Sequence, residues 1–439
     1  MRHSLIFARG AKQRKPARTG NVDVPGEHAL SSHAVPATSR PFWILGATLA
    51  LLLFASSVPS PLYSVYQERW GFSSFVLTSV FAVYALALLA ALICLGALSD
   101  AYGRRPVLAV ALVALIVAMA LFAAASSVAW LFVARIVQGV ATGVATSAII
   151  AALAEVEPSG DAQRAALVSS SAPTFGLAGG ALGAGILVQL APAPRVLSYL
   201  CVLALLVVAL AALALVPESA PHRTGHWQVR PVAVRPEVRG AFMVGAAGIV
   251  ASWAFGGLVL SLGPSLAATT LDVSGHVIGG VIIAVLCLSG GVAQLTLRRL
   301  STNDAVRGGG ASMLTGLALL VLAVEDSSAV ALFSAAVLIG IGFGLVFMGS
   351  FRSLAALARE DDRAELLSAV YVVAYLSMSV PAVAAGLAVG EYGLKDTTVV
   401  FACATAATVV IAILGTRRPQ PEHRVVHVPC PCSAPAEPA

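Results

Sequence analysis

Charge is scarce in this sequence. Asp, Glu, Lys and Arg make up only 11% of the 439 residues, whereas 58% are hydrophobic and the mean hydropathy is +0.89. Because soluble domains contain about a quarter charged residues, this chain has too few charged side chains to cover a surface that faces water. The scarcity excludes an ordinary soluble protein and indicates one that lies in a lipid bilayer.

Motifs that carry chemistry are absent as well. The chain has no Gly-x-Ser-x-Gly nucleophile turn and no phosphate-binding loop. Its six cysteines are scattered and match neither a zinc site nor a disulfide framework. We therefore expect no enzymatic activity, no metal site, no cofactor and no fused ATPase.

The N-terminal tail lacks the marks of a nucleic-acid arm or a signal peptide. Residues 1–40 hold seven Lys or Arg against Asp23 and Glu27, without interleaved aromatic side chains and without the apolar core of a signal peptide. We expect 1–41 to be a disordered basic tail in the cytoplasm, beside anionic lipid and with no nucleic-acid partner.

Twelve apolar runs follow the tail, each long enough to cross about 30 Å of hydrocarbon at about 1.5 Å per residue. Because lipid offers no partner for backbone polar groups, such runs must be helical. The predicted spans are 42–66, 73–97, 106–127, 129–154, 163–190, 195–216, 239–264, 274–297, 308–324, 327–351, 364–389 and 396–416.

One long polar connection, 217–238, divides the spans into 42–216 and 239–416. Each part holds six spans and the two lengths are nearly equal, which indicates an internal duplication with a substrate cavity between the repeats. We predict an all-α integral membrane protein of twelve transmembrane helices in two pseudo-symmetric six-helix bundles, followed by a Pro-rich cytoplasmic tail at 417–439.

Basic residues are distributed unevenly over the loops. Thirteen arginines lie in or beside the even-numbered loops, on the side of the N-terminus, whereas the opposite loops hold only Arg69, Arg195 and Lys395. Positive charge favours the cytoplasmic side. We expect a multi-pass protein of the cell (inner) membrane with both termini in the cytoplasm.

The loop after the second span, 96–106, reads Gly-Ala-Leu-Ser-Asp-Ala-Tyr-Gly-Arg-Arg-Pro. It resembles the Gly-x-Leu-x-Asp-x-x-Gly-Arg-Arg/Lys signature of the major facilitator superfamily, and the resemblance implies that family's twelve-helix fold and transport by alternating access. In one state we expect Asp100 to pack near the helix N-terminus that opens span eleven, where a carboxylate is stabilised. The predicted gating residues are Gly96, Asp100, Gly103, Arg104 and Arg105.

Span four contains Arg135-Ile-Val-Gln-Gly, which is similar to the family's Arg-x-x-Gln-Gly element. An arginine at mid-membrane costs about 2.5–3.5 kcal/mol on insertion scales. We therefore expect Arg135 to face a wet cavity or a partner, with Gln138 on the same helical face. The alternative is that Arg135 extends outward to the membrane surface.

Span five has small residues at a spacing of four, which is typical of close helix packing. It resembles the antiporter motif Gly-Pro-x-x-Gly-Gly, with Ala181 in place of the proline, so the kink of the drug/proton-antiporter subgroup is not encoded at that position. The predicted helix-packing residues are Gly139, Gly176, Gly180 and Gly185.

No acidic residue lies in the central part of any predicted span, although proton-coupled relatives commonly place a carboxylate there. Glu155, at the end of span four, and Asp272 with His276, before span eight, remain as proton-linked candidates. Two alternatives stay open: all three are interfacial loop residues, or the charge of the substrate completes the cycle.

Polar and aromatic side chains in otherwise apolar spans are candidates for the substrate cavity. With one cation and several aromatics, such a cavity suits amphipathic drugs or neutral organic solutes. We predict a monomeric, proton-coupled exporter of small organic molecules; the alternative is a facilitator or importer of a small nutrient such as a sugar or amino acid. The candidate cavity residues are Ser56, Ser57, Tyr63, Tyr84, Arg135, Gln138, Trp253, Gln294, Tyr371 and Tyr375.

Overall fold

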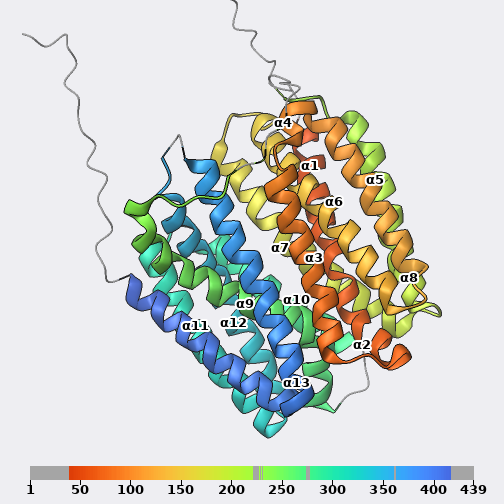
Figure 1. The fold of residues 1–439 in the computed structure, drawn as a ribbon, viewed down its shortest axis with the longest axis vertical. Coiled ribbons are helices and arrows are strands. Elements are labelled where there is room, and N and C mark those ends of the chain that lie inside the picture. Colours follow the sequence, from red (N-terminus) through yellow and green to blue (C-terminus); the bar gives the residue numbers. More distant parts are fainter. Residues whose placement is uncertain are drawn as a thin grey trace, which may run out of the picture. The chain divides into compact units, whose positions relative to one another are not determined.

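A computed structural model of the chain describes residues 39–220, 227, 229, 231–272, 277–359 and 362–416. These residues form helices and no strand (Figure 1), so the predicted all-α fold is confirmed. The helices are α1 (Arg40–Ser57), α2 (Pro59–Trp70), α3 (Ser74–Leu95), α4 (Leu98–Tyr102), α5 (Arg104–Ala123), α6 (Val128–Glu155), α7 (Ala162–Leu190), α8 (Pro194–Ala212), α9 (Arg239–Leu271), α10 (Val277–Thr296), α11 (Thr302–Asp326), α12 (Ala329–Ala355) and α13 (Arg363–Gly415), with the 3-10 turns η1 (Leu213–Leu215) and η2 (Pro236–Val238).

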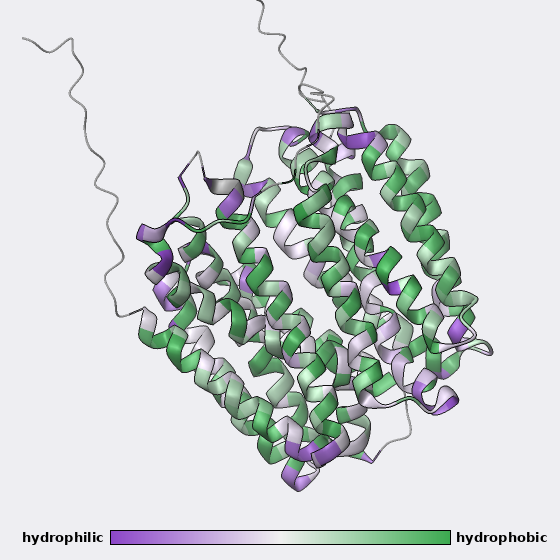
Figure 2. Ribbon diagram, viewed as in Figure 1, coloured by the Kyte–Doolittle hydropathy of each residue, from purple (hydrophilic) through white to green (hydrophobic). Residues whose placement is uncertain are grey.

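By length and composition, eleven segments of the described chain could cross a membrane. The first, Arg40–Trp70, comprises α1 and α2. The last lies in α13, whose 53 residues would measure about 80 Å as a straight helix. Gly393 interrupts α13 with φ 80° and ψ 167° and divides it into two passes, which brings the crossings to the twelve predicted. Figure 2 shows apolar residues along the helices and polar residues gathered at the two ends.

Helix pairing repeats in the two halves of the chain. We call α1–α8 the N bundle and α9–α13 the C bundle. In the N bundle, α1 packs on α7, α3 on α6, and α5 on both α6 and α8. In the C bundle, α9 packs on α13, α10 on α12, and α11 on both α12 and α13. Each of these four contacts in the N bundle thus has a counterpart six spans later in the C bundle, as the predicted pseudo-symmetry requires.

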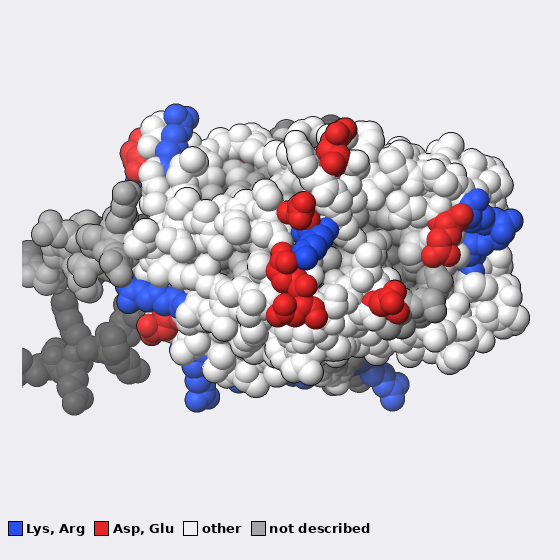
Figure 3. All heavy atoms as spheres, turned by 90° about the horizontal axis from the view of Figure 1, so that it is seen from below, with Lys and Arg blue, Asp and Glu red and all other residues white. Residues whose placement is uncertain are grey.

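The two bundles meet along two helix pairs, α3 with α13 and α7 with α10. We call the membrane side at which α1 begins the tail face, and the side of the α13 turn at Gly393 the far face. Figure 3 views the far face, where acidic and basic side chains form a few small groups on an otherwise uncharged surface. Close to the Gly393 turn in the chain, Lys395 Nζ forms an ion pair with Glu325 Oε2 at 2.7 Å.

One predicted span ends at a proline, but the helix in the structure continues past it. The predicted span 239–264 stops at Pro264, but α9 continues to Leu271, so that boundary is wrong. A proline inside a helix removes one backbone hydrogen bond, and membrane helices tolerate this loss where neighbours pack closely. Here the ring of Pro264 lies against Gly279 of α10, where a Cβ would collide with it. In α7, Pro173 stands inside the helix two turns before Ala181.

Candidate functional site

The signature loop turns sharply at Gly103. This glycine has φ 103° and ψ 149°, a conformation that side chains disfavour, and it connects the short α4 to α5. Gly96 serves the same loop: a Cβ there would meet the carbonyl oxygen of Leu92, one turn earlier in the chain, so a glycine permits the turn after α3.

Arg104 is the centre of a polar network at the tail face. Its Nη1 donates to Asp100 Oδ1 and to Ser99 Oγ (2.8 Å), and its Nη2 donates to Glu155 Oε1 (2.8 Å). Ser219 Oγ donates to the other Glu155 oxygen at 2.6 Å. The network connects the loop between α3 and α5 to the end of α6 and to the segment after α8, so these parts of the N bundle are fastened together.

Glu218 caps α5. Its carboxylate accepts hydrogen bonds from the backbone N–H groups of Arg104 (2.8 Å) and Arg105 (3.2 Å), the first two residues of the helix. A carboxylate at this position satisfies free N–H groups and complements the helix dipole. Of the predicted gating residues, Arg105 therefore contributes a backbone donor, while its partner Glu218 was absent from the prediction.

Arg135 lies two turns into α6 and its side chain is 0% exposed. Its Nε and Nη2 donate to Tyr63 Oη, and its Nη1 donates to Ser56 O (3.0 Å) and to Gln138 Oε1 (2.6 Å). All three acceptor oxygens are neutral. Of the predicted alternatives for Arg135, the structure shows the one with a partner within the protein. The side chain neither extends to the membrane surface nor faces an open wet cavity.

Aromatic rings enclose the same guanidinium. Its carbon lies 5.0 Å from the ring centre of Tyr84, 5.4 Å from that of Tyr63 and 5.7 Å from that of Phe122. These distances allow cation–π attraction, which is stronger where water is excluded. Tyr84 Oη also donates to Ser56 Oγ at 2.8 Å. The rings and neutral acceptors together stabilise a buried positive charge.

A break in the first span explains why acceptors are available to α6. Pro59 has no N–H group, so the helical donor that would reach Ala55 O is missing. Gln138 Nε2 donates to this oxygen at 2.9 Å. The proline that separates α1 from α2 therefore creates the site that the Arg-x-x-Gln element fills.

The model of the family described as Major Facilitator Superfamily matches residues 45–382, which is more than half of the chain. The chain belongs to the major facilitator superfamily. The signature loop and the Arg135 element both lie within the matched region. No curated protein matches this superfamily member closely in sequence.

Solved structures share the fold at low sequence identity. A mutant of the nucleoside transporter NupG has a TM-score of 0.69 at 12% identity, covering 86% of this chain and 100% of its own. A bacterial homologue of the human lysosomal transporter Spinster, solved inward-facing and unoccupied, has a TM-score of 0.68 at 13% identity, covering 88% and 99%. The human organic anion transporter MFSD10 (TETRAN) has a TM-score of 0.61 at 16% identity, covering 85% and 99%. This major facilitator is therefore a membrane carrier of small molecules by family and by fold.

A second group of predicted cavity residues meets in the C bundle of the carrier. Trp253 of α9 lies edge-on to Tyr375 of α13, with ring centres 4.9 Å apart, and 5.8 Å from Phe347 of α12. Phe351, one turn after Phe347, continues the row at 5.8 Å. We call these four side chains the aromatic row. The two phenylalanines were missed in the sequence, although their spacing of four places them on one face of span ten.

Other candidates have packing roles in this carrier. Gln294 Nε2 donates to Gly344 O at 3.1 Å and so joins α10 to α12. Ser57 Oγ donates to Phe54 O within its own helix. Tyr371 lies one turn before Tyr375 on α13, without a ring contact to the aromatic row.

The predicted packing glycines all lie against other helices. A Cβ at Gly139 would collide with α3, and at Gly176 or Gly180 with the backbone of α1. Gly185 contacts Gly280 of α10, across the junction between the bundles. Small residues allow helices to approach this closely in a membrane.

The proton-linked candidates of the carrier do not lie at mid-membrane. Glu155 belongs to the Arg104 network, and its side chain is 25% exposed at the tail face. Asp272 ends α9 at the far face in a left-handed conformation, with φ 49°. His276 lies outside the described residues.

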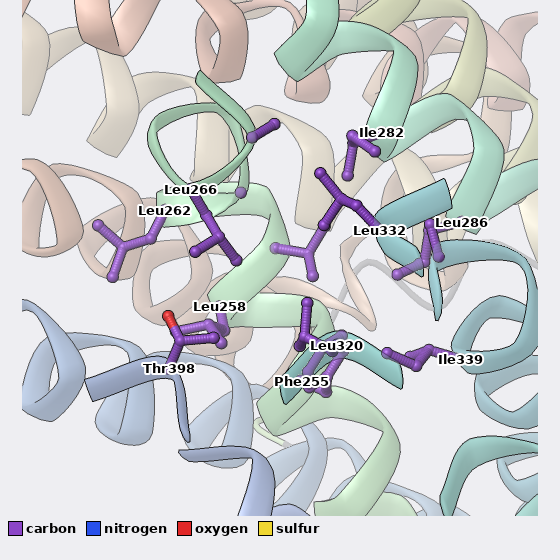
Figure 4. A pocket seen from close by; sticks show the side chains of 14 residues that line it. Phe255, Leu258, Leu262, Leu266, Ile282, Leu286, Leu320, Leu332, Ile339 and Thr398 are labelled. Atoms are coloured by element: carbon purple, nitrogen blue, oxygen red, sulfur yellow. The ribbon is translucent and has the colours of Figure 1, made fainter. Parts of the chain in front are cut away.

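The C bundle also contains an apolar cavity of about 30 Å³ (Figure 4). Its walls come from α9 to α13, and Thr398 is its one polar lining residue. The hydroxyl of Thr398 donates to Leu394 O at 2.7 Å, so it is satisfied within its own helix. A cavity with apolar walls and no free polar partner stays dry.

Proposed function

We propose that this carrier exports small organic molecules from the cytoplasm by alternating access, driven by a proton gradient. The observation that carries the proposal is the uneven joining of the two bundles. Near the far face, Gly185 lies against Gly280, and Gln189 Oε1 accepts the N–H of Val277 at 3.3 Å. In the other helix pair, Gly386 of α13 packs against the first turn of α3.

The tail face is joined differently. Its described ion pairs lie within one bundle or its adjoining linker: Arg104 with Asp100 and Glu155, Arg164 with Glu157, and Arg235 with Asp362. Among the residues that the structure describes, no ion pair at this face connects the two bundles. The arrangement supports a carrier that opens at the tail face while the far face stays closed. The Spinster homologue of similar fold was solved in an inward-facing conformation.

The arginine-rich loops support placing the tail face in the cytoplasm. Cargo would then enter from the cytoplasm, and closing of the tail face would carry it outward. In the closed state we propose that Asp100 exchanges Arg104 for the N-terminus of α13, where the helix dipole favours a carboxylate. Asp100→Asn should then slow transport without reducing membrane insertion.

The driving force is proposed to be a gradient, because the sequence contains no phosphate-binding loop. Glu155 is the proposed proton-linked group. It is reached by solvent at the tail face and holds Arg104 and Ser219 together. A proton on Glu155 would weaken this network and so connect proton binding to movement of the signature loop.

Inverted membrane vesicles with an acidic interior test the proposal. A panel of cationic drugs, neutral aromatics, sugars and amino acids is offered outside, with empty vesicles and Asp100→Asn as controls. We expect accumulation of an aromatic solute that a protonophore abolishes. Accumulation that does not depend on the pH gradient would contradict proton coupling. Uptake by right-side-out vesicles but not by inverted ones would favour the alternative of a nutrient importer.

A further inference from the structure

We propose that the aromatic row binds a planar, uncharged organic molecule that carries a hydrogen-bond acceptor. This inference rests on the proposed function, because it assigns a substrate class to the carrier. The row consists of Trp253, Phe347, Phe351 and Tyr375, and its three helices belong to the C bundle. Two of them, α9 and α13, contact α3 of the N bundle.

The aromatic row differs from the other large aromatic group in the membrane. Around Arg135, the three rings of Tyr63, Tyr84 and Phe122 belong to residues that are at most 6% exposed. Trp253, Phe347 and Tyr375 lie two or more turns from the ends of their helices, Phe351 lies one turn before the end of α12, and all four side chains are only partly buried. Partly exposed rings at mid-helix offer faces and edges on which another planar ring can stack.

Trp253 supplies the specificity. Its Nε1 atom is buried, and it has no hydrogen-bond partner among the described residues. A buried donor without an acceptor has lost its hydrogen bond to water and gained none in return. A bound molecule that presents an oxygen or nitrogen acceptor at this point would remove the penalty, whereas a hydrocarbon of the same shape would not.

Charge decides against a cation. The sequence places no carboxylate in the central part of any span, and the one mid-span charge is the positive charge of Arg135 on the facing bundle. A cationic ring would be left without a counter-ion in a medium where unpaired charge is costly. A neutral ring avoids this cost, so the substrate class is neutral and planar.

Three probes of equal size separate these requirements. Coumarin is planar and neutral and carries a carbonyl acceptor, naphthalene lacks the acceptor, and N-methylquinolinium carries a positive charge. Saturable binding to the purified carrier in nanodiscs, above partition into empty nanodiscs, is measured by equilibrium dialysis. We expect coumarin to bind tightest and N-methylquinolinium weakest.

Trp253→Phe keeps a ring and removes the N–H group. We expect it to weaken coumarin binding about 5- to 10-fold, the equivalent of one hydrogen bond, and to leave naphthalene binding unchanged. Phe347→Ala should weaken both probes. Trp130→Phe is the matched control, because Trp130 is 40% exposed on the outside of α6 and should affect neither.

Size-exclusion profiles and thermal midpoints show whether each variant is folded. Equal binding of coumarin and naphthalene by the native carrier, or an unchanged coumarin affinity in folded Trp253→Phe, would overturn the proposed site. If coumarin binds as expected but inverted vesicles do not accumulate it, the site stands and the export function fails. If vesicles export solutes that do not depend on Trp253, the export function stands and the site fails.

Discussion

The centres of the two bundles share the same glycine-mediated helix packing, but they contain opposite kinds of side chain. In the N bundle, Gly139 and Gly143 of α6 pack against the backbone of α3. In the C bundle, Gly340 and Gly344 of α12 pack against the backbone of α10. These two glycine pairs fix a register between α6 and α12.

In this register Arg135 corresponds to Ala336 and Gln138 to Ile339. Arg135 and Gln138 form the hydrogen-bonded centre of the N bundle, whereas Ala336 and Ile339 line the apolar cavity of the C bundle. Both bundles therefore bring their helices together with small residues at equivalent positions, but the side chains at their centres differ. A buried charge with directional hydrogen bonds holds the middle of the N bundle, whereas uncharged side chains, mainly through dispersion contacts, hold that of the C bundle.

Removing the cation should have the largest effect. Arg135→Ala leaves Tyr63 Oη, Ser56 O and Gln138 Oε1 without this donor in a buried site, and each unpaired group costs about 1–3 kcal/mol. We expect a markedly lower thermal midpoint by fluorescence-detected size exclusion, and loss of transport. Arg135→Lys keeps the charge but not the planar guanidinium, so its thermal midpoint should lie between those of the native protein and Arg135→Ala. A midpoint equal to the native value would show that the network does not hold the bundle.

The reciprocal change tests whether the C bundle can accommodate a buried arginine at the position equivalent to Arg135. Ala336→Arg places a guanidinium among apolar walls without acceptors, at a cost of about 2.5–3.5 kcal/mol on insertion scales. We expect a lower yield of folded protein in the membrane fraction, measured by the same size-exclusion assay. Normal yield and midpoint would mean that the cavity takes up water or that the arginine escapes to an interface.

Filling the cavity should have a smaller effect, of opposite sign. Ala336→Val adds two methyl groups to the cavity, and cavity-filling changes commonly stabilise by about 0.5–2 kcal/mol. The matched control is Ala148→Val in the N bundle, where the alanine is 0% exposed and the same change should overpack the core. If the two substitutions shift the thermal midpoint alike, the bundles do not differ in packing as described.

The smallest expected effects concern two tail-face carboxylates, one on each bundle. Burial tends to raise the pKa of Glu157, but the backbone N–H groups of Asp161 and Ser159, with Arg164, outweigh it and lower the pKa. The backbone N–H of Arg359, against a smaller effect of burial and with help from Arg235, lowers the pKa of Asp362.

A carboxylate with a lowered pKa stabilises the fold at pH above its unfolded value, about 4, and this contribution is lost as the pH falls through the folded pKa. Glu157→Gln and Asp362→Asn should therefore lower the thermal midpoint at pH 7, and the difference from the native protein should vanish at acidic pH. A deficit that persists unchanged at low pH would assign the loss to packing.

Hydropathy and spacing predicted the twelve crossings and the duplication, because bilayer thickness sets the length of every span. The break at Gly393 falls between the predicted spans 364–389 and 396–416, but its confinement to a single residue and the continuation of α9 past Pro264 depend on local conformation and on neighbouring helices. Such features leave little trace in a hydropathy pattern.

The candidate site was predictable only in part. Ser56, Tyr63 and Tyr84 were proposed with Arg135 as polar residues in apolar spans, but their common hydrogen bonds depend on how three of the spans meet. Glu218 was missed, since a capping carboxylate that acts over more than a hundred residues of chain has no local pattern.

The hydrogen bonds of Arg135 also set an order for biosynthesis. Apart from Gln138, one turn later on the same helix, every group that accepts from the guanidinium or lays a ring on it comes earlier in the chain. When α6 leaves the ribosome, Ser56, Tyr63, Tyr84 and Phe122 have already been synthesised. The helix that carries a charge into lipid is thus delivered to partners that precede it, and the first three spans can act as an internal chaperone for the fourth.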